Sequence, residues 1–458
     1  MPSIESLVLP PPANQLTLFG YLIILVTFLH ITFISVFLGS SLLSVIFNIL
    51  DKKQPNPIYS RFAKDLLETG IYNKSFGVIL GLLPMMTLTV LFSQILYGSG
   101  LPIHIFFNSA LFLLALGLIL IYMYQHTFPQ RDKRFLLHIC WGILGLAVLF
   151  GAYFIFIGGT TLITDFEKRS FIQRPDPYSL LFSWSVIARY KIFLFASLAI
   201  TGGAALFYFF EFYEDSDSID EDYGAFLRKF CAGLSLACIA ILPVMMVWNL
   251  ITLPVIALSP KVFAMTSLSI ILFVAIFYLL YGILMHGVRP HAVLHKEGAL
   301  YKPRLMFYDK SKSVVHVLIL FILAFSVITI SDQITIENAI RDHSLNLVVQ
   351  AEEARKKLLA EAEKMRSEEA VHDKAGGEKI FNSRCTACHL YDKKLVGPPF
   401  NTVLPKYESN PDELIAFIQS PTKKDPGYPP MPNYGLNRSE ASGVASYILK
   451  RLKGEVSN

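Results

Sequence analysis

Charged residues are scarce in this chain of 458 residues: Asp, Glu, Lys and Arg make up 16% of it, whereas 53% is hydrophobic. Such a composition is too apolar for a soluble protein, so most of the chain is expected to lie in a lipid bilayer. Cysteine is also rare, and three of the five cysteines, Cys140, Cys231 and Cys238, fall inside apolar segments. This placement argues against a disulfide framework. No nucleic-acid-binding motif is present, and the net charge of +5 comes mainly from loops beside apolar segments, so no nucleic-acid partner is expected.

Long apolar runs dominate the first three quarters of the chain. A helix needs about 20 apolar residues to cross a bilayer, and each run approaches or exceeds that length. The sequence therefore predicts an all-α, polytopic bundle of about eight transmembrane helices over residues 1–332. The runs lie near residues 16–48, 75–98, 102–125, 135–157, 179–210, 230–257, 260–286 and 313–330.

A short motif near the C-terminus carries the most specific chemistry. Residues 385–389 read Cys385-Thr-Ala-Cys388-His389, the spacing at which two cysteines form thioethers with a haem and the histidine ligates its iron. A C-x-x-C pair can also be a redox dithiol or half of a zinc site. Because the chain has no second C-x-x-C and residues 371–458 contain no zinc-type histidine pair, the haem interpretation is favoured over an accidental match.

The residues after this motif support the same interpretation. Gly397-Pro398-Pro399-Phe400 follows the histidine, Met431 lies between prolines, and a helical run covers 440–452. This order resembles class I cytochrome c over residues 371–458. The resemblance implies a small helical domain with one haem c bound covalently to Cys385 and Cys388. It also implies that His389 and Met431 are the axial iron ligands, a pair that raises the reduction potential.

The loops between the apolar runs predict the orientation in the membrane. The first run lacks a basic segment before it and is too long for a signal peptide, so it is expected to stay as a helix. Three loops are basic and should face the cytoplasm, whereas the acidic stretch at residues 214–222 carries no such signal. Both termini then lie outside, which places the haem domain in the periplasm of a bacterial inner membrane. The basic residues are Lys52, Lys53, Arg61, Lys64, Lys74, Arg131, Lys133, Arg134, Arg289, Lys296, Lys302, Arg304, Lys310 and Lys312.

Residues 333–370 join the two parts and contain neither proline nor glycine. Apolar positions alternate there with Glu–Lys pairs four residues apart, such as Glu352 and Lys356, so we expect one amphipathic helix that continues out of the last span. A semi-rigid stalk is its expected role, and a coiled-coil contact with another subunit is the alternative. Gly376-Gly377 is expected to end this helix as a hinge.

The first span resembles the opening helix of cytochrome bd oxidase subunit I. It reads Leu29-His30-Ile31-Thr32-Phe33 and then Leu38-Gly39-Ser40-Ser41, and further similarities extend over about the first 200 residues. The resemblance implies that His30 ligates a high-spin haem b and that a second membrane subunit pairs with this chain. The residues alone leave an alternative open, in which His30 is hydrogen-bonded to a neighbouring helix.

This chain also departs from the bd pattern. Residues 102–116 contain no Asp or Glu where that family has carboxylates, and Trp184 stands where it has a haem-ligating histidine. The short 254–261 loop replaces a long quinol-binding loop, so a quinol site of the bd kind is not expected. Arg189 and Lys191 lie within span five, where they would pair with haem propionates, pair with an acidic residue of a partner subunit, or snorkel to the interface.

These observations support three functional hypotheses. The first is a membrane-anchored c-type cytochrome, without catalytic residues of its own, that transfers electrons between the membrane subunits of a respiratory complex and a periplasmic redox partner. The second is a bd-like terminal oxidase subunit that passes electrons from haem c to membrane haems for O₂ reduction. The third is a membrane scaffold of a supercomplex, with no cofactor in its membrane part and a haem c in its C-terminal domain. Five lysines would steer an acidic partner or simply increase solubility: Lys393, Lys394, Lys406, Lys423 and Lys424.

Overall fold

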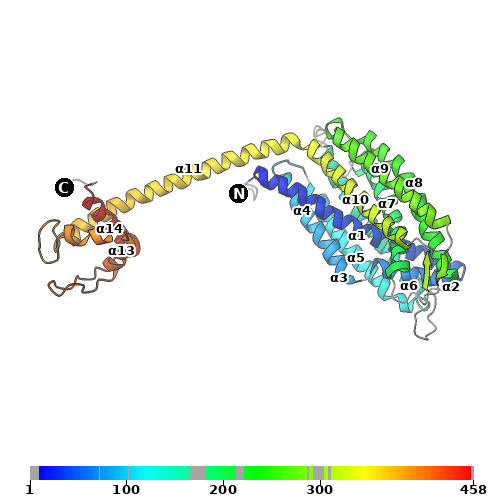
Figure 1. The fold of residues 1–458 in the computed structure, drawn as a ribbon, viewed down its shortest axis with the longest axis horizontal. Helices are drawn as coiled ribbons and strands as arrows, with labels where there is room; N and C mark the ends of the chain where they lie inside the picture. Colours follow the sequence, from blue (N-terminus) through cyan, green and yellow to red (C-terminus); the bar gives the residue numbers. More distant parts are fainter. Residues whose placement is uncertain are drawn as a thin grey trace. The chain divides into compact units, whose positions relative to one another are not determined.

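The computed structural model describes residues 10–71, 73–101, 103–165, 181–212, 221–285, 288–291, 304–307 and 311–454. The described part of the chain is all-α apart from one short ribbon (Figure 1). Within these described ranges, eight helical segments are long and apolar enough to cross a membrane, which confirms the predicted spans. Their main helices are α1 (Ala13–Lys53), α4 (Leu83–Ile95), α5 (Ile103–His126), α6 (Phe135–Thr164), α7 (Trp184–Phe207), α8 (Glu221–Thr252), α9 (Pro260–Met285) and α10 (Ser311–Ala339).

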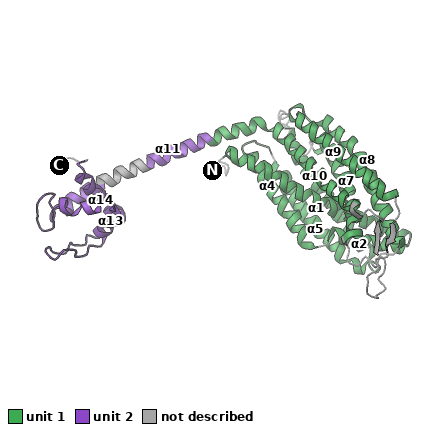
Figure 2. Cartoon of the chain, in the orientation of Figure 1, with its two compact units in different colours: residues 1–351 green, residues 352–458 purple. Residues whose placement is uncertain are grey.

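The chain divides into two compact units, residues 1–351 and residues 352–458 (Figure 2). Helix α11 (Arg341–Ile380) follows α10 after a break at Ile340 and contains the division between the units. A long helix is therefore present in the predicted stalk region. The expectation that this helix ends at Gly376-Gly377 is wrong, because α11 runs through both glycines to Ile380.

Helix α1 is the centre of the first unit, where it contacts α4, α6, α7 and α10. Small and hydroxylated side chains let α1 and α7 approach closely. The Ser197 hydroxyl donates to the Ser35 hydroxyl over 3.1 Å, and the Thr201 hydroxyl donates to the Ser35 carbonyl over 3.3 Å. Such hydrogen bonds between helices stabilise packing where surrounding lipid provides no hydrophobic driving force.

Helices α5 and α6 pack against each other through glycine. A Cβ atom at Gly117 would overlap the Leu149 side chain, and one at Gly145 would overlap the Ile121 side chain. The two helices are antiparallel neighbours joined by a short loop that contains the 3₁₀ turn Phe128–Gln130. Close backbone approach at small residues is a common way to join membrane helices.

Polar contacts fix the position of the loop between α5 and α6. Arg131, which follows α5, forms an ion pair with Asp51 at 3.2 Å and donates hydrogen bonds to Asn48 and Ser60. Between α9 and α10, strand β1 (Val288–His291) pairs antiparallel with β2 (Arg304–Phe307). This two-stranded ribbon is not among the elements predicted from the sequence.

The second unit has a compact helical core. After α11 come a π-helical turn at Phe381–Cys385, α12 (Phe400–Val403), a 3₁₀ turn at Pro405–Tyr407, α13 (Pro411–Gln419) and α14 (Arg438–Leu452). The core side chains include Phe381, Phe400, Tyr407, Tyr447 and Ile448, all of which are buried.

Glycine and a cap position the last helix of this unit. A Cβ atom at Gly377 would meet the backbone of Gly443, so α11 and α14 touch at a point where both helices lack a side chain. Helix α14 begins with a capping box, in which Asn437 accepts from the Glu440 backbone N–H and Glu440 accepts from the Asn437 backbone N–H. Such boxes satisfy backbone donors at a helix start and fix where it begins.

Candidate haem-binding site

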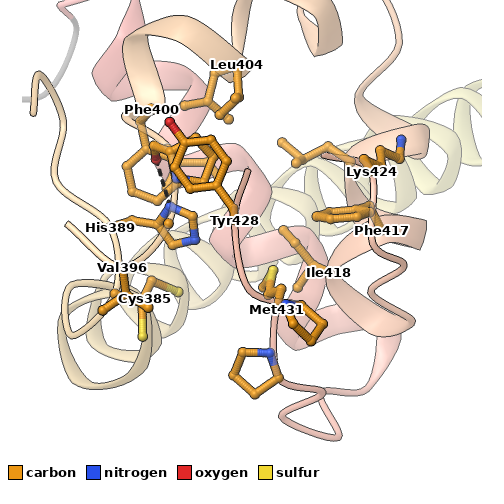
Figure 3. Close-up of a pocket in the computed structure, with 18 of the residues that line it drawn as sticks. Cys385, His389, Val396, Phe400, Leu404, Phe417, Ile418, Lys424, Tyr428 and Met431 are labelled. Carbon is orange, nitrogen blue, oxygen red and sulfur yellow. Dashed lines mark hydrogen bonds between the residues drawn. The ribbon is translucent and has the colours of Figure 1, made fainter. Parts of the chain in front are cut away.

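All four residues predicted to hold a haem c line one pocket of the second unit (Figure 3). Cys385 is the last residue of the π-helical turn, Cys388 and His389 follow directly after it, and Met431 comes from the loop between α13 and α14. The pocket has a volume of about 350 Å³ and is lined mainly by apolar side chains. That volume lies within the range typical of cofactor pockets, roughly 300–1,000 Å³.

The backbone after the π-helical turn brings the two cysteines and the histidine together. The amides of Cys388 and His389 both donate to the Cys385 carbonyl, over 3.2 and 3.0 Å. The amide of Gly397 then returns to the Cys388 carbonyl over 2.8 Å. These bonds fold the motif into a tight turn, so side chains close in sequence reach the same pocket.

The His389 ring is held in one orientation. Its Nδ1 lies 2.9 Å from the Pro398 carbonyl oxygen, and since a carbonyl only accepts, the Nδ1–H must be the donor. This bond leaves the Nε2 lone pair available as a ligand, the arrangement usual for metal-bound histidine. The ring also stacks on Phe400 at a centroid distance of 4.8 Å. A Cβ atom at Gly397 would overlap the imidazole, so glycine is needed there for the ring to occupy this position.

Met431 reaches the pocket from a loop rich in proline. Pro429, Pro430 and Pro432 surround it in the sequence and restrict the backbone of that loop. Leu414, Phe417 and Ile418 of α13 line the adjoining wall, and Figure 3 shows Ile418 beside Met431. A thioether in an apolar wall is a suitable soft ligand for haem iron.

The cysteine chemistry fits haem attachment better than the alternatives. Burial raises the pKa of the Cys385 thiol to about 11, whereas a catalytic dithiol needs a lowered pKa. Among the residues that the structure describes, no group of three or more His, Cys, Asp or Glu side chains could hold a metal ion. The pocket therefore offers two thiols, an imidazole and a thioether in an apolar environment, which suits an apolar macrocycle containing iron.

Several pocket residues were not identified from the sequence. Tyr407, Phe417 and Tyr428 line the pocket, yet no local spacing distinguishes them from core aromatics. The Lys394 ammonium lies 4.5 Å from the centre of the Tyr428 ring, and so joins the loop after His389 to the loop that carries Met431. Lys424 donates to the Tyr407 hydroxyl and to Glu413, which raises the pKa of its ammonium, the tyrosine contributing most.

His30 lies in the first unit and is buried, with 1% of its surface exposed. Its Nδ1–H donates to the Leu80 carbonyl over 3.1 Å, and its Nε2 accepts from the Tyr153 hydroxyl. Both ring nitrogens are therefore engaged across helices. This geometry favours the alternative in which His30 is a hydrogen-bonded packing residue, and it does not support a haem b ligand at this position.

Arg189 and Lys191 lie close to the start of α7, which begins at Trp184 rather than at residue 179. The Lys191 ammonium sits 4.5 Å from the Trp248 ring centre of α8, a contact that partly compensates its charge. Arg189 instead faces two internal cavities of the first unit. The two residues, for which the sequence suggests the same set of roles, therefore have different surroundings in the structure.

Comparison with known proteins finds relatives for the second unit. The family model described as Cytochrome c matches residues 375–451. Cytochrome c-551 of Pseudomonas denitrificans is 38% identical over 77 residues, which is 16% of this chain and 94% of that protein. Cytochrome c-551 of Azotobacter vinelandii is 36% identical with the same coverage. No solved structure matches the chain. The family match does not extend into the membrane-spanning helices, so the bd-like resemblance stays a prediction.

Proposed function

Because the chain belongs to the cytochrome c family through residues 375–451, we propose that it is a membrane-anchored electron-transfer subunit of a respiratory complex. A cytochrome c domain implies a covalent haem c, which carries one electron at a time as its iron changes oxidation state. The observation that carries the proposal is the convergence of Cys385, Cys388, His389 and Met431 on one pocket.

Each of these residues has a separate task in the proposal. The two thiols would form the thioether bonds that keep the haem on the chain, and the Pro398 carbonyl accepts from His389 Nδ1–H, which leaves Nε2 available as an iron ligand. Met431 would supply a second iron ligand, and Met/His ligation raises the reduction potential. Phe400 and Ile418 exclude water from the pocket, which further favours the less charged, reduced state.

The eight apolar helices support anchoring in a membrane. With an even number of spans and basic loops on the cytoplasmic side, both termini emerge in the periplasm of a bacterial inner membrane. Electrons would then pass between membrane subunits of the complex and a periplasmic redox protein. We favour this function over the oxidase hypothesis because both nitrogens of His30 are engaged in hydrogen bonds.

The experiment is a pyridine haemochrome spectrum of the purified protein before and after extraction with acid and acetone. Haem c remains with the polypeptide because its thioethers are covalent, whereas haem b or d is extracted. We expect one non-extractable haem per chain, and none in a Cys385→Ala/Cys388→Ala variant. Cys140→Ala, which changes an exposed cysteine of the first unit, is the matched control and should retain the haem. Extractable haem b or d would instead support the oxidase hypothesis.

A further inference from the structure

Arg189 and Asp332 line two adjacent cavities inside the first unit. One has a volume of about 110 Å³ and is bounded by α1, α4, α6, α7 and α10. The other has a volume of about 60 Å³ and is bounded by α7, α8, α9 and α10. Arg189, Ile192, Ile328 and Asp332 belong to both linings, so these four side chains form the partition between the cavities.

Both charged residues lie toward the same end of the helix bundle. Arg189 is near the start of α7 and Asp332 is near the end of α10. Because successive spans alternate in direction, these two ends lie with the start of α1, as Figure 1 shows for α1 and α10. The pair is therefore within the membrane-spanning part of the unit, on the side from which the N-terminus emerges.

The charge on Arg189 is only partly compensated by protein groups. A guanidinium stays protonated in proteins, and a buried charge in a membrane segment is costly without a partner. Asp332 attracts Arg189 electrostatically. Nevertheless, Nε and Nη2 of Arg189 are buried and have no hydrogen-bond partner among the residues that the structure describes.

Two buried acceptors around the same partition are also unsatisfied. In the described part of the chain, Asn249 Oδ1 and Gln333 Oε1 have no hydrogen-bond partner, and each residue lines one of the two cavities. Gln333 has only 4% of its surface exposed. Water both donates and accepts, so it satisfies the guanidinium and the two amide oxygens together. Each cavity exceeds the roughly 10–15 Å³ that one water molecule needs.

We propose that the two cavities form one hydrated site in which the Asp332 carboxylate binds and releases a proton while Arg189 remains charged. The proton is supplied by a hydronium ion of the cavity water: an O–H bond forms at the carboxylate, and one O–H bond of the hydronium breaks to leave water. A carboxylate separated from its cation by water can be protonated without first breaking a direct ion pair.

Asp332 is the proton acceptor of this site because the other charged groups near the two cavities are engaged elsewhere or are cationic. Side chains that α1, α4, α6, α8 and α9 contribute to the two linings include no titratable group. Lys191 faces the Trp248 ring, and Glu337 accepts a hydrogen bond of 3.1 Å from Gln333 Nε2. Arg189 is thus the cation that accompanies Asp332 in the linings of both cavities.

Hydroxyl-radical footprinting of the full-length protein in lipid nanodiscs tests the hydration. Met246 lines the smaller cavity and has 6% of its surface exposed, whereas Met85 is buried in α4 and lines neither cavity. We expect several-fold faster oxidation of Met246 than of Met85, because radicals form only where water is present. Equal oxidation of the two methionines would overturn the proposal.

Infrared difference spectroscopy of the same sample tests whether Asp332 binds and releases a proton. We expect a carboxylic acid C=O band that grows as the pH falls, shifts on transfer to D₂O, and is absent from Asp332→Asn. Asp342→Asn, which removes an exposed carboxylate of α11, should keep the band. A spectrum unchanged in Asp332→Asn, or a band that does not respond to D₂O, would contradict proton exchange at this site.

Discussion

A single substitution at Met431 should remove an iron ligand without affecting covalent attachment of the haem. In Met431→Ala the thioether ligand is lost but both cysteines remain, so we expect full covalent haem content. The reduction potential should fall by on the order of 0.1 V, a fraction of the range that axial ligands span. Redox titration and loss of the far-red methionine–iron band measure this. Met365→Ala, at an exposed site of α11, is the control, and an unchanged potential in Met431→Ala would exclude Met431 as a ligand.

The raised pKa of the Cys385 thiol should make the stability of protein prepared without haem depend on pH. Burial raises its pKa above the ordinary value of a thiol, to about 11, so the folded state favours the protonated thiol. The resulting contribution to stability is fully present below pH 9 and is lost as the pH rises toward 11. Alkylation of Cys385, followed by mass spectrometry, should therefore be slower in the folded than in the denatured chain at pH 9. Equal rates at pH 9 would refute this.

At the scale of elements, the contact between α11 and α14 depends on glycine. Gly377→Ala places a methyl group against the Gly443 backbone, so we expect a loss of about 1–3 kcal/mol in the free energy of unfolding of the second unit. Gly376→Ala is a matched control in the same helix, because a Cβ there meets nothing within 4 Å. It should be neutral or stabilising, since alanine favours helix. Denaturation followed by haem absorbance distinguishes the two variants, and equal stabilities would contradict this packing.

At the scale of the whole molecule, the second unit should fold without the membrane helices. Among the residues that the structure describes, its core side chains all lie between Ile380 and Leu452. We therefore expect a fragment of residues 371–458, exported to a bacterial periplasm, to bind one covalent haem with the potential of the full chain. Visible spectroscopy and redox titration are the measurements. A fragment that binds no haem would show that the proposed boundary at 371 is misplaced.

How far the sequence predicts this molecule depends on how local each signal is. The haem motif could be predicted because Cys385, Cys388 and His389 lie within five residues of the chain. The eight helices could be predicted because a run of about 20 apolar residues indicates a membrane span without any information from distant residues. The partners of Arg189 and His30 come from distant helices, and no spacing in the sequence indicates them. The sequence predicts a hinge at Gly377 because glycine disfavours helix, but the contact with Gly443 outweighs that preference.

The glycine contacts between α5 and α6 also have a consequence for biogenesis. Gly117 and Gly145 let the two helices pack along their length, and a loop of few residues joins them. The pair therefore makes its closest contacts without any other helix. During synthesis it should leave the translocon as a preformed hairpin, which then assembles with the earlier helices α1 and α4 and with the helices that follow. A bulky substitution at Gly145 would then lower the yield of inserted protein rather than the activity of the molecules that mature.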